Sequence, residues 1–562
     1  MNRTRSMLEA ASETAVKRRK SVADRIVEVI AEHSDHVFGV GGANIEDLYD
    51  ALHRSTASIT GIVAKHEFGA ATMADGYART TNRLGVVAAT SGGGALNLIA
   101  ALGESFDARV PVLALVGQPP LALEGSGAFQ DTSGGAGRID AERLFGSVAR
   151  FCVKLTRAED LTAAVEQAIS AAMAGGPAIL LLPRDIQTLP VVGSATREGQ
   201  LFGKREEPDA QDEALALVAA CTGRTVIIAG PEVARADARA ELVIMARALR
   251  AAVAVTPDAK DAFPNDDPLF AGIAGSMGHP HVAELIGDAA LCVLAGTPMP
   301  VIARAGLEAA LANCPKVLHV GADPAFVRTD ARMCGPLRTL LMKVASAAAL
   351  SGPGYAPIPT PALSVPAASG PGVRYRDAIE AISARLTPGT DVVVDAGNTG
   401  AAAVHHLSVP ADGRFVIALG MGGMGYAFGA GIGSALGRRR RTFVIAGDGA
   451  YFMHGHEVHT AVEHNVPVTF VIFNNNAHAM CVTREQLYYS GDYTYNRFGP
   501  ARIGAAVAAM FPRIPAYATG TRAEFEAALD ETSAATGPVF IEILCDPDEM
   551  PPFAPFLKEL SA

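Results

Sequence analysis

Short apolar, β-branched runs alternate with alanine-rich stretches of helical length along almost the whole chain, and this alternation restricts the fold more than any other feature. Such an order is typical of parallel sheets covered by helices. The runs fall into three blocks, so we expect an α/β fold of three domains, each a doubly wound parallel sheet. The expected strands are 37–40, 85–89, 112–116 and 178–182; 225–229, 252–255, 291–294 and 317–320; and 392–395, 415–419, 442–445, 469–473 and 539–544.

Changes of composition mark the boundaries between the blocks. A polar, charged stretch lies near residues 190–210, and residues 351–372 are dense in Pro, Gly, Ser and Ala. The basic N-terminus has no apolar run after it, so it does not resemble a secretory signal. We expect a leader over 1–20, an N-terminal domain over 21–190, a central domain over 205–350, a linker over 351–372 and a C-terminal domain over 373–562.

The charge and the cysteine usage of the chain exclude several classes of function. The 47 Lys and Arg face 58 Asp and Glu, so the net charge is −11 and there is no basic excess for nucleic acid. No run approaches the roughly 18 apolar residues of a membrane-spanning helix. The 7 cysteines are scattered without a CxxC pair, as in reduced thiols. We therefore expect a cytoplasmic protein with neither a nucleic-acid nor a membrane partner.

Residues Gly420–Gly425 form a GxGxxG motif between an expected strand and a small-residue helix over 427–436. Asp448 follows 23 residues after Gly425, at the end of the next strand. In a Rossmann domain this context binds the pyrophosphate and ribose of a dinucleotide. An NAD(P)-dependent dehydrogenase is therefore one interpretation of the third block.

A second motif in the same block points to a different ligand. Gly447-Asp448-Gly449 follows one strand, and Asn475 follows the next strand, 27 residues after Asp448. Carboxylate and amide oxygens at two strand ends suit Mg²⁺, which commonly also takes phosphate oxygens. The glycines let a diphosphate approach the backbone, and a helix expected to begin near Gly455 would point its N-terminal dipole at it. The pattern predicts a magnesium-diphosphate site.

The Gly447 to Asn475 pattern resembles the signature of thiamine-diphosphate (ThDP) enzymes, and further segments are similar to the same family. Lys65 to Arg79 looks like the helix that bears the family's catalytic glutamate, here Glu67. Thr90 to Asn97 is similar to the family's TxGPGxxN turn, with glycine in place of the proline. Gly420 to Gly433 resembles GLGTMGFGLPAAIG, which accounts for the GxGxxG motif without a nicotinamide cofactor.

Residues 111–118 and the Phe129-Gln130 pair follow as in acetolactate-synthase-like members of the family. The resemblance therefore implies the large catalytic subunit type, with pyrimidine-binding, central and diphosphate-binding domains. It also implies a homodimer or homotetramer whose active sites are shared between subunits.

The resemblance assigns roles to individual residues. Asp448, Asn475 and the main chain of Ala477 would hold Mg²⁺. Glu67 would be the acid that protonates the pyrimidine N1′, although on composition alone it could equally be a surface glutamate. Met424 would bend the cofactor into a V shape, with the backbones of Gly422 and Met424 on its aminopyrimidine. The other expected cofactor contacts are Gly447, Gly449, Ala450, His478, Met480 and Asn97.

The expected substrate pocket is also carried over from the resemblance. It comprises Ala43, Phe129, Gln130, Met480 and Arg484, with Gln130 and His478 as catalytic residues beside Glu67. Small Ala43 and the Phe129-Gln130 pair favour entry of an acceptor, whereas His478 could protonate the product or be an ordinary loop histidine.

Two departures from acetolactate synthases qualify the expected function. The chain has no Trp, and Gly296-Thr-Pro-Met-Pro stands in place of a GxR-type flavin loop, which argues against FAD. We expect a carboligase that uses ThDP and Mg²⁺, decarboxylates a pyruvate-like 2-oxo acid and transfers the acyl carbanion to a carbonyl acceptor. The alternatives are a ThDP-dependent 2-oxo acid decarboxylase and, more distantly, the dehydrogenase.

Overall fold

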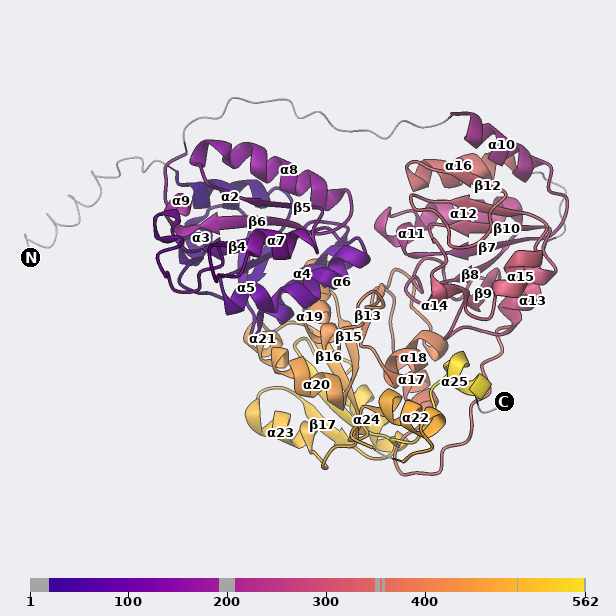
Figure 1. Cartoon of the computed structure of the whole chain (residues 1–562). Helices are drawn as coiled ribbons and strands as arrows, with labels where there is room; N and C mark the ends of the chain where they lie inside the picture. Colours follow the sequence, from indigo (N-terminus) through magenta and orange to yellow (C-terminus); the bar gives the residue numbers. More distant parts are fainter. Residues whose placement is uncertain (1–19, 192–207, 349–353, 356–358, 493, 560–562) are drawn as a thin grey trace, which may run out of the picture.

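The computed structural model describes residues 20–191, 208–348, 354–355, 359–492 and 494–559, which form three α/β units (Figure 1). Each unit is built on a six-stranded, all-parallel sheet with flanking helices, which confirms the expected fold class. The leader expected over 1–20 lies outside the described residues except for Lys20, as do residues 192–207 and parts of the expected linker (351–353 and 356–358).

The strands of the N-terminal sheet are β1 (His36–Gly39), β2 (Thr60–Val63), β3 (Gly85–Ala89), β4 (Val112–Gln118), β5 (Phe151–Lys154) and β6 (Ala178–Pro183). Those of the central sheet are β7 (Thr225–Ala229), β8 (Ala252–Val255), β9 (Phe270–Ile273), β10 (Leu291–Ala295), β11 (Val317–Val320) and β12 (Ala331–Met333). Those of the C-terminal sheet are β13 (Asp391–Val394), β14 (Phe415–Ile417), β15 (Thr442–Gly447), β16 (Val468–Asn474), β17 (Ala516–Thr519) and β18 (Val539–Leu544).

The first and third sheets have the same topology. Their strand orders are β2-β1-β3-β4-β6-β5 and β14-β13-β15-β16-β18-β17. The central sheet has the order β12-β11-β10-β7-β8-β9, which is the doubly wound order of a Rossmann-type domain. The chain therefore contains one fold twice, separated by a different one.

The longer helices of the N-terminal domain are α2 (Val22–Ile30), α3 (Glu46–Arg54), α4 (Glu67–Thr81), α6 (Ile99–Asp107) and α8 (Leu161–Met173). Those of the central domain are α10 (Pro208–Ala219), α12 (Arg239–Leu249) and α16 (Leu337–Ala347), with the shorter α13 (His281–Gly287). Those of the C-terminal domain are α17 (Tyr375–Ser383), α18 (Asn398–His406), α19 (Tyr426–Arg438), α22 (Ala479–Tyr488), α23 (Ile503–Met510) and α24 (Arg522–Glu531). No helix in the described part of the chain has the length and apolar character needed to cross a membrane.

Helices α4 and α19 join the N-terminal and C-terminal domains back to back (Figure 1). A Cβ atom on Gly76 would lie 2.2 Å from the Ala430 carbonyl oxygen, and one on Gly433 would lie 1.9 Å from the Met73 carbonyl oxygen. The two helices therefore touch through their backbones, which only glycine allows here. Around them one apolar core runs through both domains, so the two domains are held as a unit.

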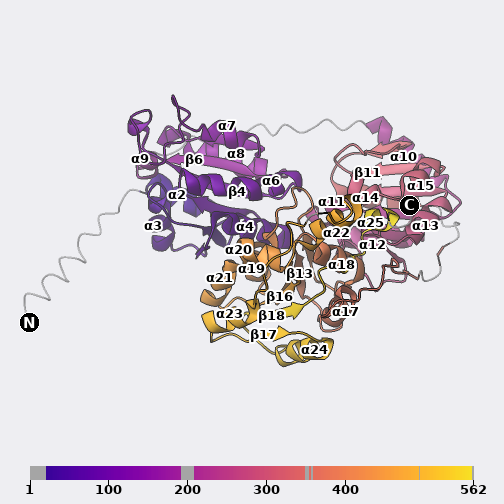
Figure 2. The same ribbon diagram turned by 60° about the horizontal axis from the view of Figure 1, so that its bottom comes forward.

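The C-terminal and central domains also meet directly. The C-terminal helix α25 (Ala554–Glu559) lies beside α22 and reaches the central domain, where the Ala554 N–H donates to the Ser276 carbonyl at 2.8 Å (Figure 2). Nearby, Lys260 of the central domain donates to the Val404 carbonyl at 2.5 Å, and His279 stacks on His405 with ring centroids 4.5 Å apart.

This contact between the central and C-terminal domains gathers basic groups. The facing groups are Lys260, His279 and His281 of the central domain and His405, His406 and Arg376 of the C-terminal domain, with Glu284 the acid that acts on His281. Burial, reinforced by the neighbouring cations, lowers the pKa of His279 to about 2, of His406 to about 3 and of His405 to about 4. The folded state therefore resists protonation of these imidazoles.

We expect the melting temperature of the protein to fall as the pH is lowered from about 7 to about 5. Histidines in the unfolded chain have a pKa of about 6.5, so in this window the unfolded state binds more protons than the folded state and is favoured. Scanning calorimetry on the wild type and on His279→Gln checks this, because glutamine can still accept the hydrogen bond from the Ile273 N–H, 3.0 Å from the His279 Nδ1. The variant should show the shallower fall; equal slopes would contradict the prediction.

Candidate active site

Four neighbouring strands of the C-terminal sheet end at one edge, and each is followed by a candidate site residue. The edge carries the loop 418–425 after β14, Asp395 after β13, Asp448 after β15 and Asn475 after β16. Gly447 pairs with Phe473 in the ladder, so Asp448 lies one residue and Asn475 two residues beyond a pair of opposed positions. The strand-end argument from the sequence is thus realised in the geometry of the sheet.

The helix expected to begin near Gly455 begins earlier, and that expectation was wrong. Asp448 is itself the first residue of α20 (Asp448–His454), and Gly455 lies in a 3₁₀ turn between α20 and α21 (Val458–Glu463). The chain passes from strand to helix at Gly447, which has an extended backbone (φ −88°, ψ 166°), so the N-terminus of α20 lies at Asp448 itself.

Asp448 is a buried carboxylate with one oxygen left without a partner. Its Oδ1 accepts from the Gly449 N–H at 2.9 Å, whereas no described residue hydrogen-bonds its buried Oδ2. Burial raises the pKa of Asp448 to about 6, and backbone N–H groups of Gly449, Asn476 and Ala477 offset part of this rise. The carboxylate therefore lies near the backbone of Asn476 and Ala477, and its unpartnered oxygen is of the kind that a cation would bind.

Asn475 is buried and held by two hydrogen bonds. Its Oδ1 accepts from the Ala477 N–H at 3.0 Å, and its Nδ2 donates to the Tyr375 hydroxyl at 3.0 Å. Together the two bonds fix the orientation of the amide. No group of three or more His, Cys, Asp or Glu side chains able to hold a metal occurs among the described residues, so a metal at this edge would need these amide and carbonyl oxygens.

His478 and Met424 close over the Gly449 turn. A Cβ on Gly449 would lie 2.5 Å from the His478 Nδ1 and 3.2 Å from the Met424 Cε, so only glycine leaves both side chains in place. The His478 Nδ1 is buried without a hydrogen-bond partner in the described structure, and burial lowers the pKa of this residue. Ala450 lies in the first turn of α20, and Met480 lies in the first turn of α22. The oxygen donors of Asp448 and Asn475 and the glycine at position 449 fit a metal-bound diphosphate.

The loop 418–425 is shaped by two glycines with left-handed backbones, Gly422 at φ 64° and Gly425 at φ 86°. Its C-terminal end is fixed by Asp395, which accepts from the Gly425 N–H at 3.0 Å and from the Ala427 N–H at 2.9 Å. Burial raises the pKa of Asp395 to about 6. Gly422 and Met424 come before this fixed end of the loop and remain accessible to solvent.

A second group of candidate residues gathers at the same kind of edge in the N-terminal domain. Glu67 is the first residue of α4, capped by His66, and accepts from the Asn97 Nδ2 at 2.9 Å. A Cβ on Gly94 would lie 2.9 Å from the Glu67 Oε1, so the glycine gives the carboxylate room. Gln130, with a left-handed backbone at φ 59°, packs beside Gly92 of the same turn.

The remaining substrate-pocket candidates lie at the surface of the single chain. Ala43 is exposed in the turn before α3, next to Asn44, which donates to the Ser91 hydroxyl at 2.7 Å. The Phe129 side chain is 77% exposed. Arg484 lies with its guanidinium 5.9 Å from the ring centroid of Phe556 on α25, away from the Glu67 group. The structure thus brings Glu67, Asn97 and Gln130 onto one turn, whereas Phe129, next to Gln130, is exposed and Arg484 packs against α25.

The two groups are connected through residues that the sequence reasoning missed. The buried Glu457 accepts from the Lys65 N–H at 2.9 Å and from the His66 N–H at 3.0 Å, so the C-terminal domain holds the chain just before Glu67. Phe68 stacks on His454 with centroids 4.2 Å apart. Asp395 had a signal in the sequence, as the last residue of an expected strand, and Glu457 stands in a His-Glu pair that fails the HExxH zinc motif, whereas Tyr375 belongs to no motif.

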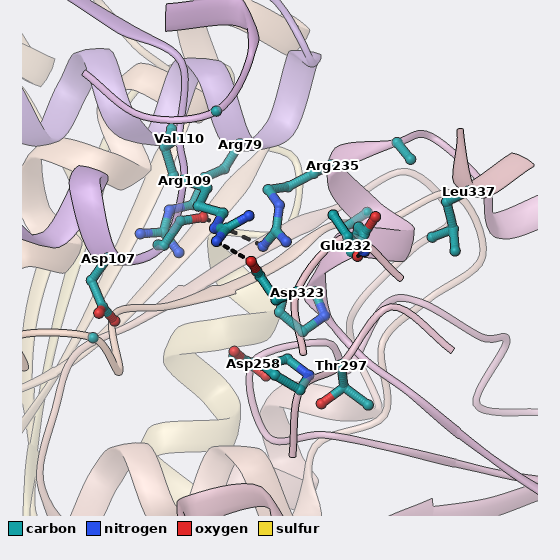
Figure 3. Close-up of a pocket in the computed structure, with 18 of the residues that line it drawn as sticks. Arg79, Asp107, Arg109, Val110, Glu232, Arg235, Asp258, Thr297, Asp323 and Leu337 are labelled. Carbon is teal, nitrogen blue, oxygen red and sulfur yellow. Dashed lines mark hydrogen bonds and ion pairs between the residues drawn. The ribbon is translucent and has the colours of Figure 1, made fainter. Parts of the chain in front are cut away.

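A cavity of about 1190 Å³ lies where the three domains meet and is bordered by Leu419 and Gly420 at the start of the loop 418–425. Arg109 pairs with Asp323 across it, and Arg235 donates to the Ala108 carbonyl (Figure 3). Thr297 and Pro298 of the loop that stands in the flavin-loop position are part of its wall, and that loop offers no basic side chain. The loop does not fit the flavin pattern, and we derive no role for FAD.

Comparison with known proteins agrees with this site. Family models for thiamine pyrophosphate enzymes match their N-terminal TPP binding domain at residues 20–136, their central domain at 212–343 and their C-terminal TPP binding domain at 395–543. A probable acetolactate synthase large subunit of Methanocaldococcus jannaschii is 27% identical over 95% of this chain and 93% of its own length. The acetolactate synthase isozyme 1 large subunit of Escherichia coli is 26% identical over 95% of this chain and 96% of its own. With all three domain models matched in order along most of its length, the chain belongs to the thiamine pyrophosphate enzymes.

Proposed function

We propose that this enzyme is a Mg²⁺-dependent carboligase that decarboxylates a pyruvate-like 2-oxo acid and transfers the acyl unit to a carbonyl acceptor. The observation that carries the proposal is the buried Asp448, whose carboxylate lies near the backbone of Asn476 and Ala477 and whose Oδ2 has no described partner, in a chain similar over 95% of its length to an acetolactate synthase large subunit. ThDP, when bound, supplies the carbon nucleophile on which a 2-oxo acid loses CO₂.

The residues of this chain would divide the remaining work. Asp448, Asn475 and the carbonyl of Ala477 would bind Mg²⁺, and the Gly447–Ala450 turn would leave room for the diphosphate. Met424 and the Gly422 backbone would hold the aminopyrimidine, and Glu67, oriented by Asn97, would hold the proton on its ring nitrogen. Gln130 and Ala43 would border the space for substrate.

The acceptor step distinguishes this proposal from simple decarboxylation. Small Ala43, open to solvent at the same domain edge as Gln130, leaves room for a second carbonyl compound. His478 supports the alternative of a 2-oxo acid decarboxylase, because its Nδ1 lacks a described partner and could deliver a proton to the product. Whichever partner reaches the reactive carbon first decides the outcome.

Incubation with ThDP, Mg²⁺ and a panel of 2-oxo acids, pyruvate first, with and without carbonyl acceptors, tests the function. We expect CO₂ release to be matched by a 2-hydroxy ketone or a 2-hydroxy-2-acyl acid when an acceptor is present, detected by mass spectrometry. Ala43→Phe should reduce ligation more than CO₂ release, because the ring would fill the acceptor space. Free aldehyde stoichiometric with CO₂ in the presence of acceptors would show a decarboxylase instead.

We further propose a homodimer or homotetramer, located in the cytoplasm, whose active sites combine the Glu67 group of one subunit with the Asp448 group of another. Glu67 is only partly buried in the single chain, although a proton-holding carboxyl needs a drier setting. Large apolar side chains near both groups are also between 47% and 58% exposed, namely Val63, Met421, Phe452 and Met453. A second copy of the chain would cover these side chains.

A further inference from the structure

A network of buried polar side chains connects α4 and α6 of the N-terminal domain with α19 of the C-terminal domain. Arg79 donates to Asp75 at 2.6 Å and to Glu104 at 3.0 Å. Asp75 also accepts from the hydroxyls of Ser105, at 2.6 Å, and Tyr426. Asp75 is 0% and Glu104 3% exposed, so these charges are compensated within the chain rather than by water.

Glu104, at one end of this network, accepts hydrogen bonds from the backbone of the loop 418–425. The Glu104 Oε2 accepts from the Met421 N–H at 2.6 Å, and its Oε1 lies 3.4 Å from the Gly420 N–H. Asp395 holds the other end of the loop, so two carboxylates from two domains fix the segment that contains Gly422 and Met424.

Every described partner of Glu104 is a donor. Arg79 and the two backbone N–H groups all need an acceptor, and a carboxylate can serve all three. A glutamine amide would keep one accepting oxygen but turn an NH₂ group toward another donor, which leaves at least one buried N–H unsatisfied. A carboxylate is therefore required at this position in a way that shape alone does not explain.

We propose that Glu104 is a positioning residue that sets the backbone of the 418–425 loop from the neighbouring domain and thereby controls the affinity for ThDP. The inference rests on the proposed function, since it takes Gly422 and Met424 as cofactor contacts. Glu104 itself does not reach the reacting atoms; it acts through the loop.

Glu104→Gln tests the proposal, with Asp391→Asn as the matched control. Asp391 is also a fully buried carboxylate that pairs with an arginine, Arg438 at 3.0 Å, and accepts a backbone N–H, from Arg414 at 2.9 Å, but it lies at the opposite end of β13. Both variants should lower the melting temperature. Only Glu104→Gln should raise the Kd and KM for ThDP, by about tenfold or more, while kcat at saturating ThDP stays within about threefold.

Hydrogen exchange of the ligand-free enzyme gives a readout that is independent of activity. Amides of residues 419–425 should exchange faster in Glu104→Gln and unchanged in Asp391→Asn. Glu104→Asp keeps a carboxylate beside Arg79, but the shorter side chain no longer reaches the loop, so this variant should also weaken ThDP binding. It replaces Glu104→Gln as the test if the glutamine variant fails to fold. Equal ThDP affinity in the wild type, Glu104→Gln and Glu104→Asp would overturn the inference. A wild type that does not bind ThDP would instead overturn the proposed function.

Discussion

Asp448→Ala should lose Mg²⁺-dependent binding of ThDP while remaining folded. The variant removes the one charged ligand of the proposed metal site and leaves only the amide of Asn475 and a carbonyl. Loss of a residue that only supports a metal ligand typically lowers the metal affinity by about 10- to 100-fold. Loss of the ligand itself should therefore lower the affinity for Mg²⁺ by more than about 100-fold. Without a cation the buried Asp448 carboxylate is itself unfavourable, so the ligand-free variant should be about as stable as the wild type.

Scanning calorimetry with and without ThDP and Mg²⁺ measures this directly. Ligand at about 100 times its Kd should stabilise the wild type by about 2.7 kcal/mol, whereas the alanine variant should show no shift. Asp391 is a buried carboxylate at the far end of the same sheet, and the Asp391→Asn variant should still be stabilised by ThDP and Mg²⁺. If NAD(P) stabilised the wild-type protein and ThDP with Mg²⁺ did not, the GxGxxG motif would be better explained as the dinucleotide-binding site of a dehydrogenase.

Glu67→Gln should separate binding from turnover. The amide can still accept the hydrogen bond from Asn97 that Glu67 accepts at 2.9 Å, so ThDP should bind with similar affinity. The glutamine amide cannot exchange a proton with the pyrimidine nitrogen. Because positioned acid–base groups contribute roughly 10²- to 10⁴-fold to reaction rates, turnover should fall by about that factor. Single-turnover measurements of CO₂ release at saturating ThDP should show a loss of that size; unchanged turnover would rule out Glu67 as the acid.

Mixing the two inactive variants tests whether the sites are shared. In a hybrid dimer of Glu67→Gln and Asp448→Ala, a shared arrangement places both defects in one site and leaves the other site intact. Co-expression should therefore restore up to about half of the wild-type activity in purified hybrids, as expected for residues that act as a unit. If each site were built from one chain, both sites would carry a defect and the hybrid would be inactive.

The central strands of the three sheets could be predicted from the sequence, whereas of the six edge strands in the described structure only β14, expected over 415–419, could be. The strands that sequence patterning missed are β2, β5, β9, β12 and β17, and all five lie at sheet edges. Their sequences, such as Thr60–Val63 with only Ile62 buried, lack the continuous apolar run of a strand covered on both faces. Central strands such as β18, over Val539–Leu544, were predicted with the bounds that the structure has.

The same limit applies to the candidate site. Asp448 and Asn475 could be paired from sequence because each follows a recognisable central strand. Glu104, Glu457 and Tyr375 could not, because their importance lies in which backbone groups they meet across a domain boundary, and no local pattern records that. The roles of Phe129 and Arg484 stay predictions, since their side chains lie at the surface of the single chain.

The repeated strand order gives the packing of α4 on α19 a meaning beyond stability. Each helix follows an edge strand of its own sheet, α4 after β2 and α19 after β14, so the two are equivalent elements of a repeated fold. The loop that leads to α4 ends at the proposed acid Glu67, and the loop that leads to α19 carries Gly422 and Met424. An ancestral pair of identical domains would have offered the same loop twice, and divergence would have made one copy the proton donor and the other the cofactor cradle.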